Sequence, residues 1–108
     1  MSKFLVLYRA PMSAREQMAN STPQQRKAGM DAWMVWAAKA GSAIVDLGAP
    51  LGDREAVGSG TSGDQVAGFS ILQAGSQADV VTLLEEHPHL QTPGGSIEVH
   101  EILSMPGT

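Results

Sequence analysis

The sequence predicts an α+β fold, a ferredoxin-like β-α-β-β-α-β sandwich with an antiparallel four-stranded sheet and two helices on one face. Three observations lead to this prediction. Four short runs rich in β-branched and aromatic residues alternate with two segments of helical periodicity. A glycine-rich loop lies between the second and third runs, where the split β-α-β unit has a hairpin. The 108 residues have room for a single domain, residues 1–108, with one hydrophobic core.

The first two predicted strands each carry a candidate site residue. The apolar run Lys3–Arg9 is closed by Pro11, and strand alternation makes Tyr8 and Arg9 face opposite ways at its carboxyl end. The second strand, residues 43–50, carries Asp46 among apolar residues. A carboxylate there is either exposed or bonded to a backbone donor, or it is buried, which would favour its protonated form and suit it to proton transfer.

Capping boxes predict where the first helical segments begin. Ser13 starts a short turn, and Thr22 starts a longer helix that Gly41 ends. Trp36 lies about 60° to one side of the apolar stripe of this helix, which suits a pocket wall or a subunit contact as well as plain packing. The stripe itself, which we expect in the core, consists of Met30, Trp33, Met34, Ala37 and Ala38.

Residues 52–65 are predicted to form a flexible loop, because four glycines lie there among serine, threonine and aspartate. Gly58–Gly63 matches the dinucleotide fingerprint G-x-G-x-x-G. That motif binds phosphate when a strand precedes it and a helix follows it at once. Here the third predicted strand, residues 66–73, follows instead, so we predict no nucleotide binding by this loop.

The segment after the third strand holds all three histidines. Ser76 caps a second long helix and Pro88 ends it, so we expect His87 at the helix terminus, where the helix dipole favours an imidazolium. His89 begins the following loop. His100 lies in the last predicted strand, residues 96–104, on the same face as Glu98 and Ile102.

General acid–base chemistry is the activity that this histidine segment favours. An imidazole titrates near neutrality, and a nearby carboxylate fixes its tautomer. We name His89 and then His87 as candidate catalytic residues, with Asp46 as the carboxylate partner. The alternative is structural: His87 as a helix terminus and His100 as a hydrogen-bonded strand residue. The candidate pocket residues are Tyr8, Arg9, Trp36, Glu98 and His100.

Neither a metal nor an organic cofactor is predicted. His87 and His89 are two residues apart across a proline and do not form the i, i+4 pair that zinc peptidases use. The chain has no cysteine to supply a thiolate. Together with His100 or Glu98 the two histidines would form a three-ligand site only if the loop folded back over the last strand.

Composition excludes several classes of partner. The net charge is -4, the pI is about 5.1 and the basic residues are scattered, so direct nucleic-acid binding is not expected. The apolar run at residues 4–8 is too short for a membrane span or a signal peptide. We therefore expect a cytoplasmic protein without membrane contact. Two helices cover only one face of the predicted sheet, so we expect a second copy on the other face, giving a homodimeric α/β barrel.

Six short motifs, in order along almost the whole chain, resemble the YCII-related proteins, particularly the DGPF-type branch. The resemblance implies a ferredoxin-like protomer in a dimeric barrel and a small pocket beside the sheet. This chain departs from the family pattern in two places. Its first strand has no histidine, and the Asp-Gly-Pro-Phe signature is absent, with residues 47–50 as the nearest run. The motifs are Lys3–Arg9, Met30–Trp33, Asp46–Leu51, Gly68–Ile71, His87–His89 and Gly95–Glu101.

The resemblance also implies two kinds of function. In the family a histidine and an aspartate are suspected as an acid–base pair, and a few relatives act on chlorinated or hydroxylated aromatics. This chain is then a small cofactor-independent enzyme of proton-transfer, isomerase or lyase type, acting on a small aromatic molecule. The alternative is a non-catalytic ligand-binding or regulatory dimer, because DGPF-type members are often linked to sigma-factor systems.

Overall fold

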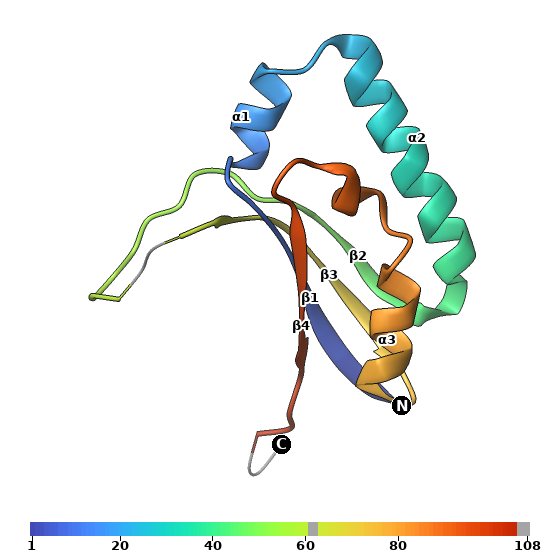
Figure 1. Ribbon diagram of the computed structural model, residues 1–108. Helices are drawn as coiled ribbons and strands as arrows, with labels where there is room; N and C mark the ends of the chain where they lie inside the picture. The colour runs from blue at the N-terminus through green and yellow to red at the C-terminus, as the bar shows by residue number, and fades with distance from the viewer. Residues whose placement is uncertain (61–62, 106–108) are drawn as a thin grey trace.

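The computed structural model describes residues 1–60 and 63–105, which form a four-stranded antiparallel sheet with its helices on one face (Figure 1). The strand order is β2-β3-β1-β4, as in a ferredoxin-like unit, so the predicted fold is confirmed. Residues 61–62 of the predicted glycine-rich loop lie outside the described part. The elements are β1 (Ser2–Ala10), α1 (Ala14–Ala19), α2 (Pro23–Ala40), η1 (Gly41–Ala43), β2 (Ile44–Pro50), β3 (Gln65–Ala74), α3 (Gln77–Leu84), η2 (Pro88–Gln91) and β4 (Ser96–Glu101).

The expected caps set the starts of the three α-helices and the end of α2. The Thr22 hydroxyl accepts the Gln25 N–H at 3.1 Å, and the Gln25 side chain accepts the Thr22 N–H at 2.8 Å, completing the capping box of α2. Gly41 ends α2 with a φ of 54°. None of the helices in the described ranges is long and apolar enough to cross a membrane.

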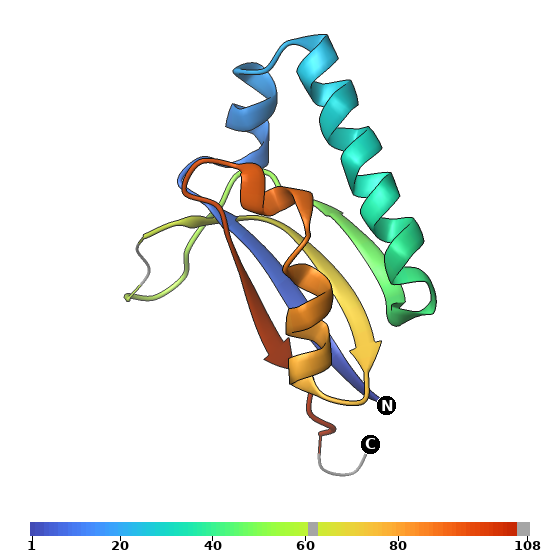
Figure 2. The ribbon, with the colours of Figure 1, turned by 45° about the vertical axis from the view of Figure 1, so that its right-hand side comes forward.

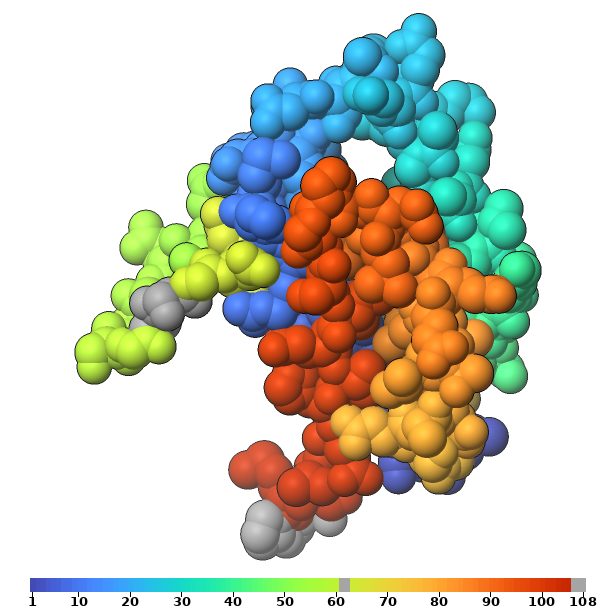
Figure 3. All heavy atoms as spheres, in the orientation of Figure 1, coloured from blue at the N-terminus to red at the C-terminus, as the bar shows by residue number. Residues whose placement is uncertain are grey.

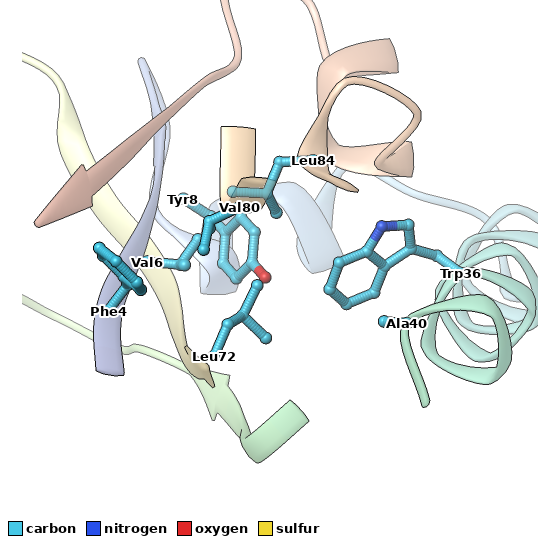
Figure 4. Packing of buried hydrophobic residues seen from close by; sticks show 8 residues of the cluster. All are labelled: Phe4, Val6, Tyr8, Trp36, Ala40, Leu72, Val80 and Leu84. Carbon is cyan, nitrogen blue, oxygen red and sulfur yellow. The ribbon is translucent and has the colours of Figure 1, made fainter. Parts of the chain in front are cut away.

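The core lies between one face of β1 and β3 and the helices (Figure 4). Strand alternation is confirmed, because the even-numbered residues of β1 from Phe4 to Ala10 are buried and the odd-numbered ones are more exposed. The helices contribute their side chains from two directions, α3 from above β1 and α2 from one side. The buried apolar cluster comprises Phe4, Val6, Tyr8, Trp36, Ala40, Leu72, Val80 and Leu84.

Helix α2 reaches the core with its carboxyl-terminal turns alone, where Trp36 and Ala40 are buried. The predicted buried stripe is wrong for Met30, Met34 and Ala38, which are exposed. The reason lies in the path of the helix: with α1 it forms an arch that rises away from the sheet (Figures 1 and 2). The space-filling view shows an opening through the molecule beneath this arch (Figure 3).

No helix of residues 1–60 and 63–105 covers the other face of the sheet (Figure 2). Its centre is apolar, because Leu5 pairs with Ile71 and Leu7 pairs with Phe69 across β1 and β3. All four side chains are half-buried within the single chain. The molecule measures 46 × 39 × 20 Å, so its shortest dimension matches one sheet and one layer of helices.

A single methyl group added at the turn in β2 is expected to lower the stability of the protein strongly. Replacing Gly48 by alanine should destabilise the protein by about 3 kcal/mol, because its φ is 80° and a Cβ would overlap the Phe69 carbonyl. Gly58→Ala is the matched control, with a φ of 87° and no atom within 4 Å of its Cβ, and should lose only about 1 kcal/mol. Urea unfolding of both variants measures the difference; equal losses would contradict the close approach of β2 to β3.

Candidate functional site

A cluster of five rings forms where α2, β1 and the segment after α3 meet. We call it the aromatic–histidine cluster; it consists of Tyr8, Trp33, Trp36, His87 and His89. His87 lies at its centre. Its ring stacks on Tyr8 with centroids 4.7 Å apart, and contacts Trp33 at 4.3 Å and Trp36 at 4.4 Å in edge-on geometry. Residues from opposite ends of the chain are thus brought together around one imidazole.

Local structure fixes the tautomer of His87. Helix α3 ends at Leu84, and His87 instead caps the turn η2, where its Nδ1 accepts the N–H of His89 at 2.9 Å. Because Nδ1 is an acceptor, the ring hydrogen of the neutral imidazole lies on Nε2. This Nε2 is buried and has no hydrogen-bond partner among the described residues. A buried N–H donor enclosed by aromatic rings is therefore the central feature of the cluster.

His87 is uncharged over the neutral pH range. Burial, together with the nearby His89, lowers its pKa from 6.5 to about 3. The prediction of an imidazolium at a helix terminus is therefore wrong. Pro88 did not place the helix end, because α3 stops three residues before His87 and leaves that side chain free to turn into the core.

His89 offers the complementary group. Its Nε2 lies 2.8 Å from the backbone oxygen of Arg9, and because a carbonyl only accepts, this nitrogen carries the hydrogen. When the ring is neutral, Nδ1 is then a lone-pair acceptor, and no hydrogen bond to it is found in the described part of the chain. With 7% of the residue exposed, His89 is largely but not wholly closed off from solvent. The two histidines thus present opposite hydrogen-bonding roles, and both rings contact Tyr8.

Tyr8 is held in the cluster by two successive hydrogen bonds. Its hydroxyl donates to the Ser70 oxygen at 2.8 Å, and the Ser70 hydroxyl donates to the Leu47 carbonyl at 2.6 Å. Burial raises the pKa of Tyr8 to about 12, and the Ser70 hydrogen bond offsets only part of that rise. The phenol therefore remains protonated and serves as a stacking surface for His87 and an edge contact for His89.

Asp46 does not join the histidines. It lies exposed on the edge strand β2, and its Oδ1 accepts the N–H of Gly48 at 2.8 Å. Sequence reasoning left exposure and burial open for this residue, and the structure has the exposed arrangement. No carboxylate contacts His87 or His89 in residues 1–60 and 63–105, so the expected imidazole–carboxylate pair is replaced by the bond from His89 to the Arg9 carbonyl.

Three of the predicted pocket residues lie together on the opposite, uncovered face of the sheet. Oε1 of Glu98 is 3.4 Å from the Arg9 guanidinium and 3.5 Å from Nε2 of His100. The Arg9 guanidinium also donates to the backbone oxygen of Asp64 at 2.8 Å. We call Arg9, Glu98 and His100 the open-face triad. Sequence alternation predicted that Glu98 and His100 share a face, and this is confirmed.

The tryptophans exchange their expected roles. Trp36 is 3% exposed and its Nε1 donates to the Leu83 carbonyl at 3.0 Å, whereas Trp33 is half-buried. Helical spacing identifies a stripe but does not say which turns of the helix reach the sheet, so Trp33 was missed as a site residue. A shallow groove of about 310 Å³ runs past Trp36 on the outer surface, lined also by Lys39, Thr82, Leu83, Glu85 and Glu86.

Within the described ranges, no three potential metal-ligating side chains converge.

The fold of this chain is shared with a protein of known structure. The chain is similar in structure to the 5-chloro-2-hydroxyhydroquinone dehydrochlorinase TftG of Burkholderia phenoliruptrix, solved in complex with 2,5-dihydroxybenzoquinone. The TM-score is 0.55, the match covers 97% of this chain and 96% of that one, and 18% of residues are identical. No family model and no curated protein matches the sequence. At this identity the likeness establishes a shared fold.

The lowered pKa of His87 predicts acid-sensitive stability. Unfolded His87 takes up a proton below about pH 6.5, but folded His87 does so only near pH 3, so stability falls as the pH drops between these values. His87→Asn keeps an acceptor for the His89 N–H but does not titrate. Urea unfolding at pH 7 and pH 4.5 should therefore show a larger loss for the wild type than for this variant.

The exposed His100 provides the control for that experiment. His100→Asn makes the same chemical change outside the core. Measured at a protein concentration at which the chain is monomeric, it should lose as much stability between pH 7 and pH 4.5 as the wild type does. If His87→Asn also retains the full loss, the acid sensitivity belongs to other groups, and the buried neutral imidazole is not its source.

Proposed function

We propose that this chain is a YCII-related protein that acts on a small hydroxylated aromatic or quinone without a metal or an organic cofactor. The observation that carries the proposal is the pair of histidines in the aromatic–histidine cluster. One presents a buried N–H without a polar partner, at Nε2 of His87, and the other presents a lone pair, at Nδ1 of His89. The proposed chemistry is proton transfer at a ring hydroxyl or its carbonyl tautomer.

The two histidines suit different parts of such a ligand. A neutral imidazole whose pKa lies far below neutrality serves as a hydrogen-bond donor that polarises a carbonyl or stabilises an oxyanion, without delivering its own proton. This role fits His87. A base needs a free lone pair held in a fixed orientation, and the bond to the Arg9 carbonyl orients His89 in that way. His89 is thus the proposed base and His87 the proposed electrophilic partner.

Access to the pair is through Trp33. This side chain contacts both Tyr8 and His87, yet it is half-buried and belongs to the part of α2 that forms the arch. The opening beneath the arch in Figure 3 lies on the same side of the sheet. We infer that a planar ligand replaces Trp33 against the rings of Tyr8 and His87, where stacking stabilises a flat π-system.

The structural neighbour supports this class of ligand. TftG is named for its action on a chlorinated hydroxyhydroquinone and was solved with a dihydroxybenzoquinone. The sequence resemblance to YCII-related proteins points the same way. The alternative function, a ligand-binding or regulatory dimer without turnover, is favoured by one observation: within the described residues neither histidine contacts a carboxylate that would strengthen it as a base.

We also propose that the protein works as a homodimer through the uncovered face of its sheet. The apolar pairs Leu5–Ile71 and Leu7–Phe69 form a continuous strip there. An apolar sheet face of this kind is normally covered, and a two-fold symmetric second copy covers it with the same residues. The thin shape supports this arrangement, because a second sheet would supply the layer that a single chain lacks.

The ligand proposal predicts measurable binding of 2,5-dihydroxybenzoquinone by isothermal titration calorimetry. His87→Asn removes the Nε2–H donor but keeps the acceptor at Nδ1, and it should weaken binding about tenfold, the usual effect of one lost hydrogen bond. His100→Asn changes a histidine on the other face and should bind as the wild type does. Equal affinity for all three proteins, or no binding by the wild type, would contradict the proposed site.

Turnover separates the enzyme from the binding protein. With the quinone in D₂O, proton transfer at His89 should accelerate exchange of the ring hydrogens with solvent, followed by NMR, and His89→Asn should abolish that acceleration. Binding without faster exchange would assign the protein to the non-catalytic alternative.

The dimer proposal predicts twice the protomer mass in light scattering at micromolar concentration. Phe69→Lys puts a charge at the centre of the apolar strip and should give a monomer, while Val57→Lys, at an exposed loop position, should leave the dimer intact. A wild-type monomer would refute the barrel arrangement.

A further inference from the structure

The open-face triad gives the proposed interface a titratable group. Arg9 and His100 both contact the same oxygen of Glu98, at 3.4 and 3.5 Å, and all three side chains lie on the face that bears the apolar strip. We propose that protonation of His100 weakens association with a second copy, so that assembly is linked to pH. This inference rests on the proposed dimer and concerns its regulation.

The charges on this face balance when His100 is neutral. Besides His100, the charged side chains that the four strands carry there are two cations and two anions. Lys3 and Arg9 come from β1, Glu98 comes from β4, and Asp46 pairs with Ile71 from β2. Strand β3 contributes uncharged residues at Phe69, Ile71 and Gln73. Protonated His100 therefore turns a neutral face into a positive one.

Association removes this face from water, which disfavours an added charge. Glu98 already has a cationic partner in Arg9, so a second cation gains less at the shared oxygen than it loses in hydration. Two-fold symmetry doubles the effect, because each copy brings its own positive charge to the same interface. Since imidazoles gain their proton between pH 8 and pH 5, the dimer should weaken over that interval.

Sedimentation velocity of the full chain at pH 8.0 and pH 5.5 tests this inference. The dissociation constant of the wild-type dimer should rise at least about tenfold at the lower pH. His100→Asn cannot gain a proton, so its dissociation constant should stay the same at both values. His100→Gln serves as a second neutral variant if the first does not fold, and circular dichroism checks that each protein is folded at pH 5.5.

The outcomes distinguish failure of the pH link from failure of the proposed dimer. A wild-type protein that is monomeric at both pH values overturns the dimer and the pH link together. A wild-type dimer with the same dissociation constant at both values leaves the dimer standing and overturns the pH link. If a neutral variant keeps the tenfold response, the response comes from another group and the role of His100 is refuted.

Discussion

The burial of the His87 ring against Tyr8, Trp33 and Trp36 is the interaction that joins the end of α2 to the sheet. Helix α2 reaches the sheet only through its last turns, so most of its length adds nothing to the core. The imidazole fills the space between those turns and β1. It does so in the neutral form, because a buried charge without a partner would be far more destabilising than the packing gained.

Arg9 connects the two clusters, since its backbone and its side chain serve opposite faces of the sheet. Its carbonyl accepts the Nε2–H of His89 on the helix side, while its guanidinium bonds Glu98 and the Asp64 carbonyl on the open face. The neighbouring Tyr8 supplies the ring on which His87 stacks. Two consecutive residues at the end of β1 therefore determine the geometry of both clusters, as the period of two along a strand requires.

Local features of the sequence predicted the fold well. The N-caps at Thr22 and Ser76 and the glycine at position 41 set helix ends through hydrogen bonds between residues close in sequence. Such bonds can be predicted from the order of residues. Alternation along β1 and β4 predicted which residues share a face, including Glu98 with His100. Both kinds of prediction depend on backbone geometry that does not change with the tertiary arrangement.

The site was harder to predict because it depends on how elements meet. Helical spacing placed Trp33 and Trp36 on the helix surface but carried no information about the arch, which decides that Trp36 is buried and Trp33 is only half-buried. The place of His87 depends on α3 ending early and on η2 turning the ring inward. Asp46 lies on an edge strand with irregular register, where no pattern in the chain says which way its carboxylate faces.

Because both clusters lie on β1, dimer assembly would affect the orientation of His89. A second copy on the open face would restrain Glu98 and the guanidinium of Arg9, and through the backbone of Arg9 it would restrain the carbonyl that orients His89. A base that must keep its lone pair directed at a ligand gains from such restraint, because orientation is lost when the supporting group moves. In the proposed dimer, covering the apolar strip and orienting the histidine pair would therefore be coupled through Arg9.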